Sequence, residues 1–226
     1  MRFEGAGRQQ NFDIATVGPR NNETRPRWSA ADGNKSAILA KLRKSTGMKP
    51  MITIRPARAG DADALPDIEQ SAGLAFRAIP ELAWLADGDN VSPQRHRELI
   101  AEGTCWIAVD DKDRPVGFLS AGIEGETLHI WEFDVRLNRQ GSGIGRALLE
   151  RAIKDARRRG LAAVTLTTFR DVAWNAPFYR KFGFHILEGA EIDERLASLL
   201  SGEAEHGMPA ARRCAMRLEL AKPDTR

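Results

Sequence analysis

Short apolar runs alternate with stretches of helical spacing along the chain from residue 51 onward. Alternating or continuous apolar runs favour β-strands, whereas apolar residues three and four apart favour a helix that buries one side. Strand patterns cover 52–57, 104–110, 115–123, 127–135, 163–169, 184–188 and 214–220. Helical patterns cover about fifteen residues from Asp61, and then 92–102, 142–159, 176–182 and 193–201.

The order of these elements and their connections predict one mixed sheet. Short turns separate the runs between 104 and 135, which is typical of three antiparallel neighbours. The helix at 142–159 joins two strand patterns, and such a crossover places the two strands parallel. Asp61 and Ser92 are suited to cap their helices, and Gly160 to end the long one. We therefore expect an α/β fold with a mixed, mostly antiparallel central sheet.

Three glycines lie close together where a strand pattern gives way to the long helical pattern. Gly141, Gly143 and Gly145 allow tight turning and close approach of a ligand to the backbone. The N–H groups of residues 141–145 are expected to converge beside a helix N-terminus, which carries a partial positive charge. The pattern predicts a phosphate-binding turn.

Two common nucleotide-binding patterns do not fit this turn. A Walker A loop needs Gly-Lys-Ser/Thr, but Arg146 and Ala147 follow Gly145, so ATP or GTP hydrolysis is not expected. A dinucleotide fingerprint that starts at Gly141 would need Gly or Ala in place of Arg146. The remaining interpretations are another phosphate-bearing ligand or a strand-to-helix turn without a ligand.

Two motifs stand in order, with room for one helix, one turn and one strand between them. The first is Gln140-x-x-Gly143-x-Gly145, and the second is Trp174-Asn-Ala-Pro-Phe-Tyr-Arg-Lys-Phe-Gly-Phe184. Together they resemble the cofactor motif and the Asn…Phe-Tyr-x-Lys-x-Gly-Phe signature of the GNAT superfamily of acyl-CoA-dependent N-acetyltransferases. The resemblance covers about residues 51–220. It implies acetyl-CoA as co-substrate, no metal, helices on both faces of the sheet, and two parallel strands that splay apart around the pantetheine arm.

The resemblance also assigns residues to the cofactor. The main chain of residues 133–135 is expected to follow the pantetheine arm, with the Val135 N–H as oxyanion donor. Asn175 lies four residues before Tyr179, whereas many members have seven and some share the shorter spacing. The expected cofactor contacts are Phe133, Asp134, Val135, Gln140, Gly141, Ser142, Gly143, Ile144, Gly145, Arg146 and Asn175.

Acetyl transfer from a thioester to an amine needs a proton acceptor for the amine and a proton donor for the leaving thiolate. By resemblance, Tyr179, the one tyrosine of the chain, is the donor. Glu132 and His129 are equal candidates for the acceptor. They are three residues apart and face opposite sides of a regular strand, but a β-bulge, frequent in the family, would bring them to one side. The alternative is a water relay, with one of the two contacting substrate and the other structural.

Charge is spread unevenly along the 226 residues, whose net charge is +3. Residues 1–50 hold ten Lys or Arg, four Asp or Glu and little apolar periodicity, which predicts a disordered basic N-terminal extension. Residues 51–226 are expected to form one N-acetyltransferase domain that opens naturally at Met48 or Met51. The basic segment also permits a nucleic-acid-binding tail, but the plain extension is preferred.

Other function classes find little support in the sequence. No apolar run reaches 18 residues and the four histidines are far apart, so neither a membrane span nor a metal site is expected. Cys105 and Cys214 lack close spacing and a secretion signal, which favours reduced thiols in the cytoplasm. Cys105 has no base beside it in sequence and is expected to be a buried structural thiol rather than an acetyl carrier.

The sequence leaves the acceptor open. The preferred reaction is direct transfer to a primary amine in a ternary complex, on a small molecule or a peptide. The alternatives are the same chemistry on a protein N-terminus or lysine, and a non-catalytic CoA-binding regulatory module. Trp84 and Trp106 would line a closed site for a small molecule, or else lie in the core. A homodimer is common in the family and is a further expectation, whereas membrane and nucleic-acid partners are not expected.

Overall fold

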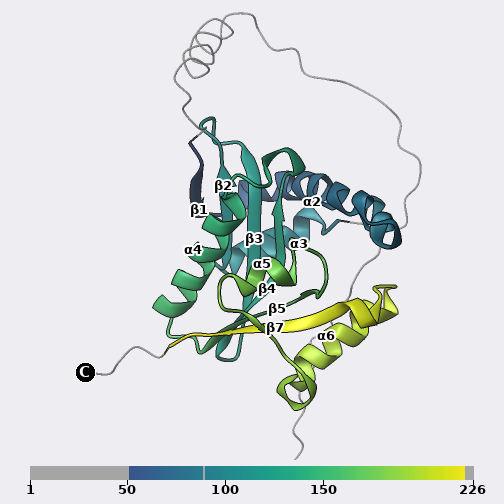
Figure 1. Ribbon diagram of the computed structural model, residues 1–226. Coiled ribbons are helices and arrows are strands. Elements are labelled where there is room, and N and C mark those ends of the chain that lie inside the picture. The colour runs from purple at the N-terminus through teal and green to yellow at the C-terminus, as the bar shows by residue number, and fades with distance from the viewer. Residues whose placement is uncertain (1–50, 89, 222–226) are drawn as a thin grey trace, which may run out of the picture. The chain divides into compact units, whose positions relative to one another are not determined.

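A computed structural model describes residues 51–88 and 90–221 (Figure 1). The prediction of a disordered extension over residues 1–50 lies outside these ranges. The strands are β1 (Thr53–Pro56), β2 (Cys105–Val109), β3 (Pro115–Glu124), β4 (Thr127–Val135), β5 (Ala163–Phe169), β6 (His185–Ile186) and β7 (Arg213–Glu219). The helices are η1 (Ala59–Ala64), α2 (Leu65–Gly73), η2 (Leu74–Ala78), η3 (Pro80–Asp87), α3 (Pro93–Ala101), η4 (Leu137–Arg139), α4 (Ile144–Arg158), α5 (Ala176–Arg180), η5 (Gly189–Glu191), α6 (Glu194–Glu205) and η6 (Ala210–Arg212), where η marks a 3-10 helix.

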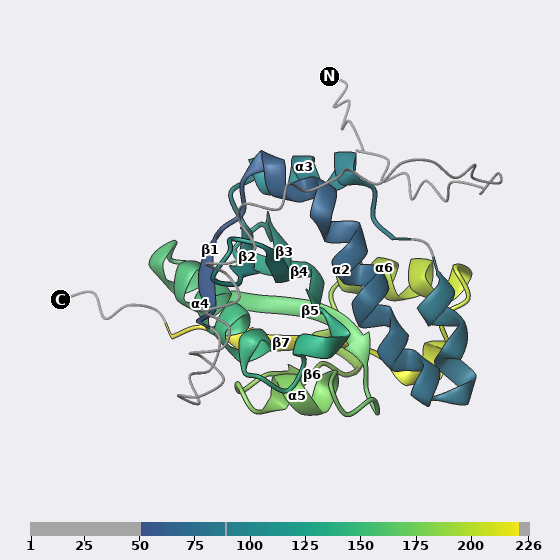
Figure 2. The same cartoon turned by 90° about the horizontal axis from the view of Figure 1, so that it is seen from above.

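The seven strands form one sheet in the order β1-β2-β3-β4-β5-β7-β6. Neighbouring strands are antiparallel except β4 and β5, which the α4 crossover makes parallel. Helix α4 lies on one face of the sheet and helices α2 and α6 on the other (Figure 2). The predicted mixed, mostly antiparallel sheet with one parallel pair is therefore confirmed.

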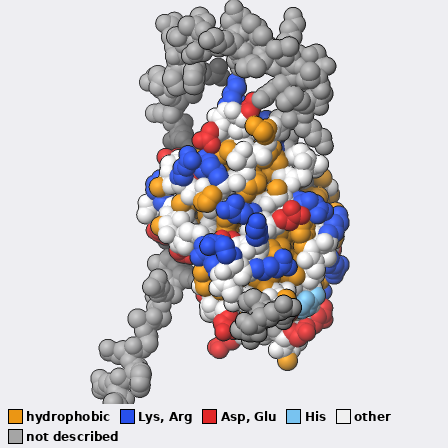
Figure 3. All heavy atoms as spheres, turned by 90° about the vertical axis from the view of Figure 1, so that its left-hand side faces the viewer, with side chains coloured by type: hydrophobic (Ala, Val, Ile, Leu, Met, Phe, Trp, Pro, Cys, Tyr) orange, Lys and Arg blue, Asp and Glu red, His pale blue; other side chains and the backbone are white. Residues whose placement is uncertain are grey.

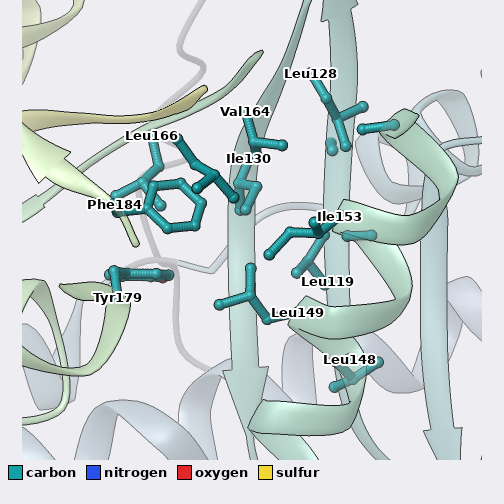
Figure 4. Packing of buried hydrophobic residues seen from close by; sticks show 14 of the residues in the cluster. Leu119, Leu128, Ile130, Leu148, Leu149, Ile153, Val164, Leu166, Tyr179 and Phe184 are labelled. Carbon is teal, nitrogen blue, oxygen red and sulfur yellow. The ribbon is translucent and has the colours of Figure 1, made fainter. Parts of the chain in front are cut away.

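Helix α4 anchors the main core. Its apolar side chains recur three and four residues apart, so one stripe faces the sheet, and Leu148 and Leu149 are fully buried. Gly143 at its start has φ +89° and Gly160 beyond its end has φ +73°, conformations that favour glycine. Figure 4 shows the packing of this stripe on the sheet, with Leu119, Leu128, Ile130, Leu148, Leu149, Ile153, Val164, Leu166, Tyr179 and Phe184.

Ser92 caps α3 as predicted, because its hydroxyl accepts a hydrogen bond from the Arg95 N–H. The prediction that Asp61 caps a helix of about fifteen residues is wrong. Residues 59–64 form the separate 3-10 helix η1, in which Asp61 is the third residue. Its carboxylate accepts two hydrogen bonds from Arg55, at 2.7 and 2.9 Å, and one from the Arg58 N–H. The ion pair with β1 fixes Asp61 inside this turn, and α2 begins only at Leu65.

Two irregularities of β4 prepare the site. The register between β3 and β4 shifts between Ser120 and Ala121, which pair with Glu132 and Ile130, so Trp131 is the extra residue of a bulge. Strands β4 and β5 pair only over Thr127–Ile130 and Ala163–Leu166, although both strands continue beyond. They diverge from that point, and the gap opens toward the N-terminus of α4.

Candidate active site

The glycine turn before α4 has the geometry of an anion cradle. Gly141 and Gly143 have φ of +71° and +89°, and a Cβ at either position would meet nothing within 4 Å. Gln140 Nε2 donates to the Val135 carbonyl at 3.1 Å, and Ser142 Oγ donates to the Arg139 carbonyl at 2.5 Å. Within the described residues, the N–H groups of residues 141–143 donate to no other group. The turn is thus held by its own side chains while its amides stay free for an anion.

The region around the cradle is basic. Arg146 extends from the first turn of α4, with its guanidinium carbon 5.1 Å from the centre of the Phe182 ring and a nitrogen 3.4 Å from Glu150 Oε1. Figure 3 shows Lys and Arg side chains gathered on the face that carries α4. Such a surface attracts a ligand rich in phosphate.

The Val135 N–H faces the gap between β4 and β5. The Arg136 N–H donates to the Val116 carbonyl of β3 at 3.0 Å. Successive N–H groups of a strand point to opposite edges, so the Val135 N–H is directed away from β3. It is available to an oxygen atom that lies between the splayed strands.

Asn175 contributes an unused acceptor near this gap. Its Nδ2 donates to Thr168 Oγ1 at 2.9 Å, on the part of β5 that has left β4. Its Oδ1 is buried and has no hydrogen-bond partner within the described residues. A buried carbonyl oxygen without a donor costs free energy, and an incoming N–H group would relieve this cost. An extended ligand with a diphosphate and amide groups fits these features: the free amides of the turn, the Val135 N–H and Asn175 Oδ1. The predicted acetyl-CoA is such a ligand.

The bulge in β4 places His129 and Glu132 on the same face of the sheet. His129 Nδ1 lies 3.0 Å from Thr165 Oγ1, a hydroxyl that also accepts from Arg195 of α6 at 3.3 Å. Because Trp131 is the extra residue, Glu132 lies on the same face of β4 as His129. The bulge considered from the sequence is present, and both candidate bases lie on the side of α2 and α6.

The two candidate bases differ in their electrostatic surroundings. His129 is 1% exposed, and burial together with the charge of Arg195 lowers its pKa to about 3. Burial and the carboxylates of Glu69, Asp134 and Glu203 raise the pKa of Glu132 well above its usual range, against the opposing charge of Arg213. Near neutral pH, His129 is a poor proton acceptor, whereas Glu132 is a stronger base than an ordinary carboxylate.

Tyr179 is near enough to Glu132 and Asp134 for their charges to act on its phenol. It extends from α5 and is 7% exposed. Its ring centre is 6.3 Å from that of Phe133 and 5.4 Å from that of Phe178. Phe184 also lies beside it (Figure 4), with ring centres 5.6 Å apart. Burial, and then the charges of Asp134 and Glu132, raise its pKa above the usual 10. The phenol therefore carries its proton near neutral pH, as a proton donor must.

Asp134 shares the face of Glu132. Burial and the charge of Glu69 raise its pKa to about 7. The structure thus brings Glu132, Asp134 and Tyr179 into one electrostatic group, and places the cradle residues at the end of the same gap.

Glu69, Glu203 and Arg213 also belong to this region but carry no motif in the sequence. Arg213 binds both oxygens of Glu203, each at 2.7 Å. The sequence does contain one indication that Glu69 is buried. It lies four residues after Leu65 and three before Ala72, and both of these are on the buried side of α2. A carboxyl on an apolar stripe is uncommon and indicates a specific partner.

The structure also places the remaining candidates. Trp106 is 2% exposed and lies in the core under α4, the second of the two alternatives given for it, whereas Trp84 is 46% exposed. Trp106 alternates with Cys105 and Ile107, which face the other side of the sheet. Cys105 Sγ lies 3.2 Å from Ser120 Oγ, and burial raises its pKa to about 11, as suits a structural thiol.

No helix in the described ranges has the length and apolar character to cross a membrane. In the same ranges, the side chains of His, Cys, Asp and Glu form no group of three that could hold a metal ion.

Comparison with known proteins assigns the family. The model of the acetyltransferase (GNAT) family matches residues 73–184. The peptidyl-lysine N-acetyltransferase YjaB of Salmonella typhimurium is 34% identical over 64% of this chain and 90% of its own length. YjaB of Escherichia coli is 33% identical over 43% of this chain, which spans 60% of that relative. PaiA N-acetyltransferase from Thermoplasma acidophilum, solved in complex with coenzyme A, has a similar fold, with a TM-score of 0.57 and 16% identity over 75% of this chain and 99% of its own. The chain belongs to the GNAT superfamily of N-acetyltransferases.

Proposed function

We propose that this acetyltransferase moves an acetyl group from acetyl-CoA directly to a primary amine while both substrates are bound. The observation that carries the proposal is that Glu132 and Val135 lie on the part of β4 that no longer pairs with β5, while the charge of Glu132 reaches Tyr179. The free amides before α4 support binding of the diphosphate, and residues 133–135 and Asn175 support the pantetheine arm.

Each residue has one role in the proposed reaction. Glu132 takes a proton from the ammonium group, and the free amine attacks the thioester carbonyl carbon. The Val135 N–H stabilises the negative charge on the carbonyl oxygen. The C–S bond then breaks, and Tyr179 gives its proton to the thiolate. The second proton of the amine nitrogen leaves as the amide forms and restores the phenol of Tyr179. A neutral His129 beside Thr165 is a structural neighbour of Glu132 in this scheme.

The acceptor carries at least one amine. The first candidate is a small amine, because the carboxylates Glu69, Glu132 and Asp134 attract a cation. The second is a lysine side chain of a protein, because the Salmonella relative is a peptidyl-lysine N-acetyltransferase. The buried free thiols of Cys105 and Cys214 suit a reducing compartment such as the cytoplasm.

Release of CoA from acetyl-CoA, measured with a thiol reagent across small amines and lysine peptides, tests the function. Turnover with any amine supports acetyl transfer, and the better acceptor class separates the two candidates. Binding of acetyl-CoA without turnover on either class would instead favour the non-catalytic CoA-binding module.

A further inference from the structure

Glu69 of α2 is a buried carboxylate held from two sides. Its side chain is 9% exposed, and its Oε1 lies 2.7 Å from Nε2 of His96, whose side chain is 0% exposed. These two atoms are in contact but do not have the alignment of a hydrogen bond. Its Oε2 accepts a hydrogen bond from the Val91 N–H at 2.8 Å. A charged group leaves water only where partners compensate it. The chain thus has a buried polar pair between α2 and α3.

The pair adjoins the wall of the active site. His96 of α3 meets the Phe118 ring edge to face, with ring centres 5.4 Å apart and an angle of 86°. Phe118 of β3 is the register partner of Asp134 on β4. Helix α2 itself packs on β3 and β4. Glu69 therefore lies on the helix that covers the face of the sheet on which the side chains of Glu132 and Asp134 lie.

The negative charge of Glu69 affects the pKa of both Glu132 and Asp134. The groups that act on Glu132 are Glu69 from α2, Asp134 from β4, Arg213 from β7 and Glu203 from α6, and Glu69 has the largest effect among them. Glu203 is already neutralised by its two contacts with Arg213. The charge of Glu69 also raises the pKa of Asp134.

We propose that Glu69, fixed by His96 and by the Val91 N–H, is a positioning residue for acetyl transfer that acts through Glu132. Its immobile negative charge favours the form of Glu132 that carries a proton. Glu132 thereby becomes a stronger acceptor for the ammonium proton. This inference rests on the proposed role of Glu132 as the base.

The test removes the negative charge of Glu69 and keeps the shape of its side chain. Glu69→Gln preserves the length of the side chain and an oxygen for the Val91 N–H. Glu126→Gln is the matched control, since Glu126 is exposed in the turn between β3 and β4, at the end of β4 away from the site. Two quantities are measured in the full chain for wild type and both variants: CoA release against pH with one amine, and the pH titration of the Glu132 carboxyl by carbon NMR, assigned with Glu132→Gln.

We expect Glu69→Gln to move the acidic limb of kcat/KM and the Glu132 titration to lower pH, each by about one unit. Its plateau kcat falls several-fold because the base is weaker, while KM for acetyl-CoA stays unchanged. Glu69→Asp, which keeps the charge, restores the profile toward wild type, and Glu126→Gln leaves both readouts unchanged. A merely structural Glu69 would alter the melting temperature without moving either titration.

An unchanged Glu132 titration in folded Glu69→Gln would overturn the proposal. If that variant does not fold, Glu69→Leu, which removes the charge and suits the apolar side of α2, takes its place: a Glu132 titration at lower pH than in wild type supports the proposal, and an unchanged titration refutes it. Absence of wild-type turnover would count against the proposed function alone, because the carboxyl titration reads the effect of Glu69 without any reaction.

Discussion

The cradle before α4 gives a prediction in which backbone strain and ligand binding can be separated. Gly143→Ala adds one methyl group at φ +89°, where nothing lies within 4 Å of the new Cβ. The fold is therefore destabilised only by the left-handed conformation of the new residue, by about 1 to 2 kcal/mol. For a chain of this length, that cost lowers the melting temperature by about 2–4 °C per kcal/mol.

Gly143→Ala should weaken the binding of CoA more than backbone strain alone would. We expect the added methyl group to enter the space in which the diphosphate is proposed to bind, and so to displace the diphosphate from the free amides. A hydrogen bond to a charged group contributes about 1.5–3 kcal/mol. Loss of one such bond weakens CoA binding about 10- to 100-fold, at 1.4 kcal/mol for each factor of ten.

Gly160→Ala is the matched control. Gly160 has φ +73°, nothing within 4 Å of an added Cβ, and a place at the other end of α4. The assay is calorimetric titration of CoA, with melting temperatures measured alongside. Both variants should lose similar stability, and only Gly143→Ala should lose affinity. Equal affinities in the two variants would refute the cradle.

Three further predictions concern the base, pH and the core. Glu132→Gln should lower kcat about 10²- to 10⁴-fold, whereas His129→Gln should lower it less; the reverse order in CoA-release assays would make His129 the base. Because the pKa of Asp134 is raised to about 7, the folded state binds more protons than the unfolded state between about pH 4 and 7, and stability falls as pH rises through this window. Asp134→Asn should therefore raise the melting temperature at pH 8 more than at pH 4, and an equal change at both pH values would contradict the burial of this charge. Leu148→Ala removes a side chain with 0% exposure and should cost about 2–5 kcal/mol in urea denaturation; a loss below about 1 kcal/mol would show that α4 packs loosely.

Local patterns determine much of this fold, and tertiary contacts decide the rest. Strand β5 matches its predicted bounds because a dense apolar run leaves few alternatives, and Ser92 caps α3 because capping is a local bond. The prediction for Asp61 is wrong because its partner, Arg55, lies on another element. The side of the sheet that Trp106 faces depends on strand register, which no single run reveals.

Some residues of the candidate site could likewise be predicted from local motifs, whereas others depend on tertiary contacts. Tyr179 and the cradle are contiguous motifs, so they stand out in the sequence. Glu69 acts on Glu132 from a position 63 residues away in the chain, and only the packing of α2 on β4 brings the two together. The low pKa of His129 likewise depends on its burial in the fold and on the charge of Arg195 of α6.

The transfer of a proton from Tyr179 is tested most directly by CoA release in Tyr179→Phe. The substitution removes one oxygen and keeps the ring between Phe133, Phe178 and Phe184. We predict that kcat falls about 10²- to 10⁴-fold while the affinity for CoA and the melting temperature stay near those of wild type. Turnover equal to wild type would contradict the assignment of Tyr179 as the acid.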